Sequence, residues 1–258
     1  MKPRRKPQHK KRSNPARRKR GNTPPLLPLY GVHTVLAACA NPRRKLHKLY
    51  VTRNILKSCE RQLEQARCPV EILENREIST LAPEGAVHQG ILAMAAPLPA
   101  TDISELKDCA LVLVLDQITD PHNVGAILRS AAAFNAGAVI ITARNSPEAA
   151  GVLAKTASGG LEHVPLVEAV NLARALEILA RQRFTIVGFD SEAEFALEKA
   201  PITAPAALVL GAEGKGLRRL TREKCDLLVR LDMPGPIKSL NVSNAAALAL
   251  YACSAVLK

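Results

Sequence analysis

Three segments in the C-terminal half of the chain combine polar side chains with glycines in patterns that could do chemistry. They are DPHNVGAILRSAAAF at 120–134, VLGAEGKGL at 209–217 and MPGPIKSLNVSNAA at 233–246. Each follows an apolar run that reads as a strand, and parallel α/β sheets bind ligands outside the carboxyl ends of their strands. We therefore expect the three segments to meet in one site.

The first segment carries a candidate cap and a candidate anion-binding side chain. Asn123 stands where a helix N-cap belongs, and Gly125 permits a close backbone approach. Arg129 follows on the same helix, among small apolar residues. The plain interpretation is a capped core helix with one surface arginine. An arginine in that setting needs a partner, however, and a carboxylate or a phosphate suits its planar fork.

The second segment places three glycines within six residues, directly after a strand. A phosphate-binding P-loop is excluded because Lys215 is followed by Gly216 and Leu217 instead of Ser or Thr. The dinucleotide fingerprint is excluded too, because the spacing of its third glycine is missing. We interpret the glycines as shaping a loop that lies flat against a ligand, with the Glu213 carboxylate among exposed backbone N–H groups.

The third segment is a stiff turn that leads into an apolar helix. Pro234 and Pro236 restrict the backbone, and Gly235 between them supplies a turn. Ser239 and Asn241 bring a hydroxyl and an amide to the start of the last helix. Either side chain could simply cap that helix, and from this segment alone capping is the favoured interpretation.

Composition and charge set the wider frame. The chain has 258 residues, 47% of them hydrophobic but only 3% aromatic, which is enough for an aliphatic core. Its apolar runs fall short of the ~18 residues that a transmembrane helix needs, so no membrane contact is expected. The six cysteines are scattered without metal-ligand spacing, and no metal site is predicted.

The net charge of +13 is concentrated at the N-terminus. Residues 1–20 contain eleven Lys or Arg and no acid, and the rest of the chain holds 25 basic and 23 acidic residues. We expect residues 1–28 to be a disordered basic tail that attracts the phosphate backbone of RNA or DNA. A solubilising or targeting arm is the alternative. A secretory signal is excluded because no apolar stretch follows the basic run.

Two ordered units are predicted after this tail. Residues 29–97 read as a compact α/β unit, residues 98–109 as a linker and residues 110–258 as a second α/β domain. In the second domain strands such as ALVLVLDQI, AVIIT and AALVLG alternate with helical patterns. This alternation predicts a mostly parallel sheet.

The three segments together resemble the signature motifs of the SpoU (TrmH-type) RNA ribose 2′-O-methyltransferases, in the same order. In addition, YGVHTVLAA and GAVHQGILA resemble parts of the RNA-binding N-terminal domain in the branch that methylates guanosine in 23S rRNA. The resemblance covers about residues 30–258. It implies a SPOUT-type catalytic domain with a trefoil knot, S-adenosylmethionine (AdoMet) as methyl donor, a cytoplasmic homodimer and large-subunit rRNA as substrate.

The resemblance also carries over individual residues. A polar set matches the family's catalytic positions: Asn123, Arg129, Glu213, Ser239 and Asn241. Another set matches its cofactor-binding segments: Gly211, Gly216, Leu231, Met233 and Leu240. The chain departs from the family in having Asp232 where proline is common and Asn135 where glycine is usual. The first change puts a carboxylate beside the expected cofactor pocket, and the second is mild because Asn tolerates a left-handed backbone.

The implied reaction is methylation of a ribose 2′-hydroxyl, and Arg129 is its key candidate. A guanidinium stays protonated, so we interpret Arg129 as a clamp on the substrate phosphate, not as the base. Four alternatives remain at this stage: a tRNA ribose methyltransferase, an rRNA methyltransferase that confers antibiotic resistance, a non-catalytic RNA-binding protein, and a nucleotide-phosphate enzyme. Neither phosphate-loop pattern fits the last of these.

Overall fold

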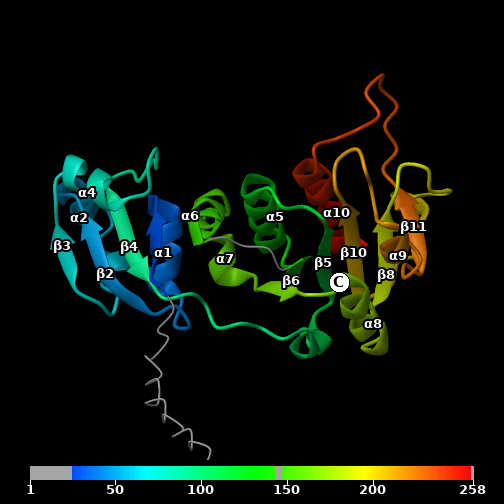
Figure 1. Cartoon of the computed structure of the whole chain (residues 1–258), viewed down its shortest axis with the longest axis horizontal. Coiled ribbons are helices and arrows are strands. Elements are labelled where there is room, and N and C mark those ends of the chain that lie inside the picture. The colour runs from blue at the N-terminus through cyan, green and yellow to red at the C-terminus, as the bar shows by residue number, and fades with distance from the viewer. Residues whose placement is uncertain (1–24, 143–146, 257–258) are drawn as a thin grey trace, which may run out of the picture.

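The computed structural model describes residues 25–142 and 147–256. Most of the predicted basic tail, residues 1–24, therefore lies outside the described residues. Two α/β units stand side by side, and α6 and α7 of the second unit lie next to α1 of the first (Figure 1). None of the helices in the described part of the chain has both the length and the hydrophobicity that crossing a bilayer requires.

The first unit is built on a small mixed sheet. Its strands run in the order β1-β4-β2-β3, with β2 and β3 parallel and the other pairs antiparallel. Their bounds are β1 Leu27–Tyr30, β2 Leu46–Val51, β3 Val70–Ile72 and β4 Ile91–Ala95. The helices are α1 Val32–Ala40, α2 Arg53–Ser58, α3 Glu60–Leu63 and α4 Asn75–Leu81. Leu29, Leu49 and Ile91 are almost fully buried in its core.

The start of this unit differs from the sequence interpretation. The sequence predicts a tail over residues 1–28 and a folded unit from residue 29, but β1 already begins at Leu27. A proline is tolerated in this strand because β1 is at the edge of the sheet, where the missing N–H leaves no ladder bond unmade on its open side. The helix α4 was not expected either.

The second unit contains a seven-stranded sheet in which every adjacent pair is parallel. The strand order is β7-β6-β5-β10-β8-β11-β9. The strands are β5 Leu111–Asp116, β6 Ala138–Thr142, β7 Leu166–Ala169, β8 Thr185–Phe189, β9 Phe195–Ala196, β10 Ala206–Gly211 and β11 Leu227–Arg230. This sheet, together with the smaller first unit, confirms the predicted fold class.

Helices cover both faces of the large sheet. They are α5 Pro121–Ala133, α6 Pro147–Thr156, α7 Gly160–His163, α8 Leu172–Arg181, α9 Arg219–Arg222 and α10 Val242–Val256. Short 3-10 helices span Ile103–Asp108 and Leu197–Lys199. The first of these lies within the segment predicted as a linker, and its Leu106 is buried in the core under α8.

The alternation of side chains along β5 explains why the sheet needs a helical layer on each face. Leu111, Leu113 and Leu115 belong to the core that includes α5 and α10, while Val112 and Val114 belong to the core that includes α8. A strand buried on both faces is apolar throughout, as the sequence of β5 predicted. The register of β5 and β10 then places Asp116 opposite Gly211, at the carboxyl edge of the sheet.

A buried ion pair joins the two units. Arg44 from the turn after α1 contacts Glu162 of α7, with Nη2 and Oε1 2.6 Å apart and side chains 1% and 2% exposed. Asn41 donates a further hydrogen bond to Glu162 Oε2 at 2.8 Å, and Arg44 Nη1 donates to the carbonyl of Ala96. Both charges in this pair are fully engaged, so the two units pack through a polar contact that fixes their geometry.

Candidate functional site

The turn after β10 is shaped by glycine. Gly214 and Gly216 have φ of 73° and 62°, a region that favours glycine, and the backbone closes through a bridge between Ala212 and Gly216. Gly211 allows this closure, because a Cβ there would lie only 2.1 Å from the carbonyl carbon of Gly216. The turn is thus folded back on the end of its own strand, which the sequence predicted only as a flat loop.

A buried carboxylate anchors the far end of this turn. Asp116 is 0% exposed and accepts hydrogen bonds from the backbone N–H of Arg218 at 2.9 Å and from its Nε at 2.6 Å. The sequence analysis does not assign Asp116 a partner. The available signal was a charged residue closing an otherwise apolar strand, since a buried charge is almost always paired.

Three side chains predicted for the site form one hydrogen-bonded chain across the segments. Asn241 Nδ2 donates to Asn123 Oδ1 and to Glu213 Oε1, each at 3.0 Å. Glu213 Oε1 also accepts the backbone N–H of Val242 at 3.0 Å, the first residue of α10. The carboxyl ends of β5, β10 and β11 are therefore tied together through residues that are far apart in the sequence.

The capping role predicted for Asn123 is wrong. Helix α5 begins earlier, at Pro121, and Asp120 is its N-cap, accepting a hydrogen bond from the backbone N–H of His122 at 3.0 Å. Proline is favoured at the first helical position because it has no N–H to leave unpaired. Asn123 is consequently inside the first turn, where its side chain is free to contact Asn241.

Capping of α10, by contrast, agrees with the sequence interpretation. Asn241 Oδ1 accepts hydrogen bonds from Ser243 N at 2.9 Å and from its hydroxyl at 2.5 Å. The same side chain thus caps the helix and joins the network to Glu213. Ser239 does not share this role: it is exposed, and its hydroxyl has no hydrogen-bond partner among the described residues.

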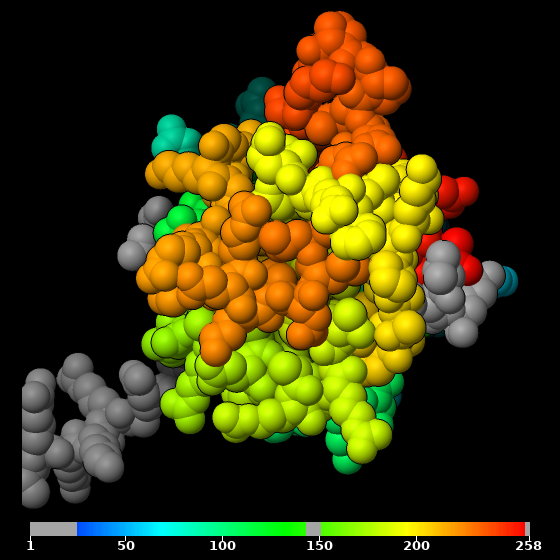
Figure 2. Space-filling view, turned by 90° about the vertical axis from the view of Figure 1, so that its right-hand side faces the viewer, coloured from blue at the N-terminus to red at the C-terminus, as the bar shows by residue number. Residues whose placement is uncertain are grey.

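A cavity opens beside this network. Its walls come from the end of β8, the turn after β10 and the loop between β11 and α10, and that last loop projects from the body of the molecule (Figures 1 and 2). Glu213 and Ser239 line it. So does every residue predicted to bind the cofactor: Gly211, Gly216, Leu231, Met233 and Leu240. The structure therefore brings all five predicted cofactor residues, with Glu213 and Ser239, into the wall of one cavity.

Arg129 stands apart from the cavity lining. It is exposed on α5, and within the described part of the chain no hydrogen bond or ion pair involves it. Six residues separate it from Asn123 on the same helix, a rise of about 9 Å. Residues 25–142 and 147–256 do not supply the partner that its sequence context called for, and the guanidinium is available to an external anion.

The two departures from the family pattern have clear structural outcomes. Asp232 is held by Arg230, with Nε and Oδ1 2.9 Å apart, and Arg230 Nη1 donates to the carbonyls of Ala193 and Glu194. The expected carboxylate beside the pocket is therefore neutralised by an arginine that itself lines the cavity. Asn135 has φ of 55°, the left-handed conformation that its amide side chain tolerates.

In the second unit, Cys253 is buried and Cys225 is partly buried. Burial raises the pKa of Cys225 to about 12, with the nearby carboxylates of Asp226 and Asp116 adding to the effect, and it raises the pKa of Cys253 to about 11. Both are neutral and non-nucleophilic at neutral pH. Within residues 25–142 and 147–256, no group of three or more His, Cys, Asp and Glu is arranged to hold a metal ion.

Replacing Glu213 with alanine should lower the free energy of unfolding by about 1 kcal/mol, the usual cost of losing a helix-capping acceptor. Glu213 Oε1 accepts hydrogen bonds from Asn241 Nδ2 and from the first N–H of α10, and an alanine side chain has no acceptor to replace it. Glu213→Gln keeps one amide oxygen and should cost less. Urea unfolding of both variants measures the difference, and equal stability of Glu213→Ala and wild type would contradict it.

Known proteins resemble this chain over nearly its whole described length. The SpoU rRNA Methylase family model matches residues 110–251, and the model for RNA 2′-O ribose methyltransferase substrate binding matches residues 28–101. The chain is 40% identical over 233 residues to the 23S rRNA (guanosine-2′-O-)-methyltransferase RlmB of Photorhabdus laumondii, covering 86% of this chain and 95% of that protein. For RlmB of Escherichia coli K12 the identity is 37%, with 86% and 96% covered.

The fold is shared with solved structures at lower identity. The SpoU methyltransferase AviRb from Streptomyces viridochromogenes, solved in complex with AdoMet, superposes with a TM-score of 0.77 at 23% identity, covering 90% of each chain. The two family matches define the class, an α/β methyltransferase domain, built on the parallel sheet, that is joined to a substrate-binding domain. The chain belongs to the SpoU rRNA methylase family.

Proposed function

We propose that this protein transfers a methyl group from AdoMet to the ribose 2′-hydroxyl of a guanosine in 23S-type rRNA, in the cytoplasm. The observation that carries the proposal is the cavity in which the turn after β10 and the loop before α10 meet, tied through Asn241 to Asn123 and Glu213. The sequence identity of this chain to RlmB proteins, which extends over both domains, supports 23S-type rRNA as the substrate.

The cavity suits AdoMet in its chemistry. Leu231, Met233 and Leu240 give it apolar walls for a flat heterocycle, and Gly211 lets the turn that forms part of the wall close on itself. Charged side chains of both signs line the cavity, Asp190 and Glu213 beside Arg230 and Lys238, which suits a ligand that carries both an ammonium and a carboxylate group. When bound, AdoMet supplies an electrophilic methyl group on a positively charged sulfur.

The chain's own residues would position the ribose. A 2′-hydroxyl is a weak nucleophile, so alignment and stabilisation of developing negative charge provide the catalysis. We assign to Arg129 the clamping of a substrate phosphate, with that phosphate or a water molecule taking the hydroxyl proton. Asn123 and Glu213 would orient the nucleotide through the Asn241 network, and Ser239, free of partners in the described chain, would contact it from the projecting loop.

Transfer of a tritiated methyl group to unmodified large-subunit rRNA tests the function directly. We expect incorporation into this RNA and little into tRNA, with the modified position mapped by primer extension as a ribose methylation at guanosine. Labelling of tRNA alone would favour the alternative tRNA enzyme. Absence of transfer to either RNA, with normal RNA binding, would favour a non-catalytic RNA-binding protein.

We further propose that the protein is a homodimer that associates through α10. Leu248 and Tyr251 are 49% and 67% exposed on this helix, and Tyr251 packs edge-on against Phe134 at the end of α5, with ring centroids 6.1 Å apart. An exposed aromatic and aliphatic pair one helical turn apart is typical of an interface.

Tyr251→Glu should convert the dimer to a monomer, because a carboxylate would be desolvated at the centre of the interface. Size-exclusion chromatography with light scattering measures the mass. Leu220→Glu is the matched control, since Leu220 is 57% exposed on α9, away from α10. A monomeric wild type, or equal dissociation in both variants, would contradict the proposed interface.

A further inference from the structure

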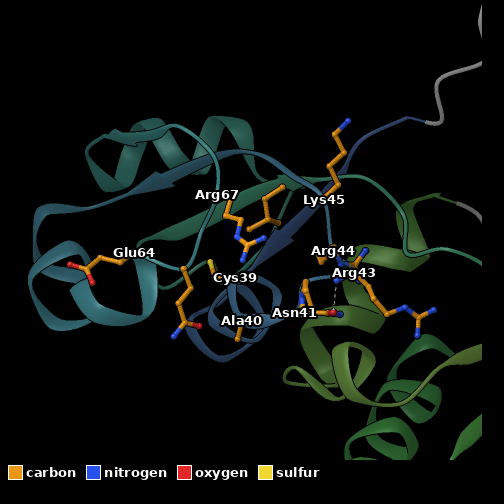
Figure 3. A pocket seen from close by; sticks show the side chains of 11 residues that line it. Cys39, Ala40, Asn41, Arg43, Arg44, Lys45, Glu64 and Arg67 are labelled. Atoms are coloured by element: carbon orange, nitrogen blue, oxygen red, sulfur yellow. Dashed lines mark hydrogen bonds between the residues drawn. The ribbon is translucent and has the colours of Figure 1, made fainter.

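A basic cavity lies in the first unit, away from the catalytic loops. Its walls are the end of α1, the turn to β2 and the segment after α3, and its volume is about 650 Å³ (Figure 3). Arg43, Lys45 and Arg67 line it, and all three are exposed. In the described part of the chain none of these three side chains has a hydrogen bond or an ion pair.

The turn that carries two of these cations is rigid. Asn41 Oδ1 accepts the backbone N–H of Arg43 at 2.9 Å, and the Lys45 carbonyl accepts the N–H of Ala96 at 2.9 Å. Arg44, between the two, points inward to Glu162. Arg43 and Lys45, on either side of Arg44, point outward. Because the turn is already ordered, binding a ligand there does not cost the backbone entropy that ordering a flexible loop would cost.

The charge of the cavity is not cancelled from within. Glu162 forms the buried ion pair with Arg44 and is only 2% exposed, so its carboxylate does not neutralise Arg43 or Lys45. Glu64 is the acid in the cavity wall, and Figure 3 shows it at the opposite end from Arg43. The exposed cations therefore outnumber the exposed acid, which favours an anionic ligand.

The remaining lining is uncharged and partly apolar. Ala40, Pro42 and Leu46 contribute apolar surface, and Cys39 forms part of the wall. Burial raises the pKa of the Cys39 thiol to about 12, so this group is neutral at physiological pH and acts neither as an anion nor as a nucleophile. A cavity with arginines at the rim and an apolar floor suits a phosphate with an attached base better than inorganic phosphate alone.

The number of exposed cations also bears on the kind of anion. Arg43, Lys45 and Arg67 together line one cavity, and several clustered cations favour a polyanionic strand over a small acid.

We infer that this cavity binds an unpaired nucleotide and its flanking phosphates in a single-stranded segment of the RNA substrate. The inference rests on the proposed RNA substrate, and it adds a contact outside the catalytic domain. Unpaired bases are the elements that proteins read in RNA, commonly by stacking on arginine planes. Arg43 and Arg67 supply such planes, and Lys45 supplies a point charge for phosphate.

The test is the combined substitution Arg43→Gln, Lys45→Gln and Arg67→Gln in the full chain. Binding of a large-subunit rRNA fragment, measured without AdoMet over a range of salt concentrations, should weaken roughly tenfold or more. The slope of log affinity against log salt should fall by about 2, for three lost contacts to a single strand. In methyl transfer, KM for RNA should rise while kcat stays near that of wild type.

The matched control is Arg53→Gln, Lys57→Gln and Arg76→Gln, which removes the same charge from exposed positions of the same unit outside the cavity. We expect it to bind RNA almost as wild type does, with unchanged thermal melting in both variants. Unchanged affinity and salt slope in the cavity variant would overturn the inference. So would an equal loss in the control, which would indicate a general charge effect.

A competition experiment separates an RNA strand from a free nucleotide. A single-stranded oligonucleotide should displace the RNA fragment from wild type. Guanosine 5′-monophosphate and inorganic phosphate should need a concentration at least roughly tenfold higher for the same displacement, because they offer fewer phosphates. Equal competition by the mononucleotide would assign the cavity to a small ligand instead. The binding and competition experiments do not depend on methyl transfer. If the wild-type protein shows no methyl transfer, the proposed function is refuted, and the RNA-binding inference is still judged by these two experiments.

Discussion

Arg129→Ala should lower kcat for methyl transfer by about 10²–10³-fold, the usual cost of removing one group that stabilises transition-state charge. Affinity for AdoMet should stay near that of wild type, because Arg129 is outside the cavity that Gly211 and Leu240 line. Initial rates with saturating RNA and calorimetry with AdoMet measure the two quantities independently.

The control for this variant is Arg174→Ala. Arg174 is also an exposed arginine on a helix, but α8 covers the other face of the sheet from α5. The two substitutions remove the same charge and similar volume, so a general electrostatic contribution to RNA binding would affect both. Turnover of Arg129→Ala at the wild-type rate would remove Arg129 from the mechanism.

Gly211→Ala should reduce the affinity for AdoMet about tenfold or more and destabilise the fold by about 1–3 kcal/mol, as expected when an extra methyl group enters a packed site. A Cβ at this position would lie 2.1 Å and 2.3 Å from the carbonyl carbon and oxygen of Gly216, and 2.5 Å from Leu217 N. These neighbours are backbone atoms, so the turn itself must move and the cavity wall moves with it.

Gly235→Ala provides the comparison for Gly211→Ala. Gly235 is in the projecting loop next to the same cavity, and a Cβ added there would meet nothing within 4 Å. Its AdoMet affinity and its urea unfolding midpoint should match those of wild type. If Gly211→Ala binds AdoMet as tightly as Gly235→Ala does, the closed turn is not needed for the cofactor.

Elements with long apolar runs were predictable, and short ones were not. β5 is buried on both faces, and its continuous apolar run in the sequence predicts such a strand. The periodic pattern of α5 likewise predicts a helix. Helices such as α7 and α9 span only four residues each, and α4 only seven. Helices this short are not stable from local propensity, and tertiary contacts decide where they form.

The site was predictable as a set of loops, but its internal bonding was not. Glu213 and Asn241 were predicted to lie together because both follow strands of one parallel sheet. The wrong cap at Asn123 arose because Asp and Asn both occur near the helix start, and only the backbone decides which one is the N-cap. The bond from Asp116 to Arg218 depends on the pairing of β5 with β10, which no local pattern specifies.

The contact between Arg44 and Glu162 makes the catalytic half a poor candidate for separate expression. If the chain were cut between residues 98 and 109, the catalytic half would keep Glu162, which is buried in the intact protein, but would lose its partners Arg44 and Asn41. Glu162 would then be solvated, but Ala154 and Leu161, which pack in the apolar core of the first unit, would lose the cover of that unit as well. Fragments intended for crystallisation or for engineering new RNA specificity should therefore retain both halves.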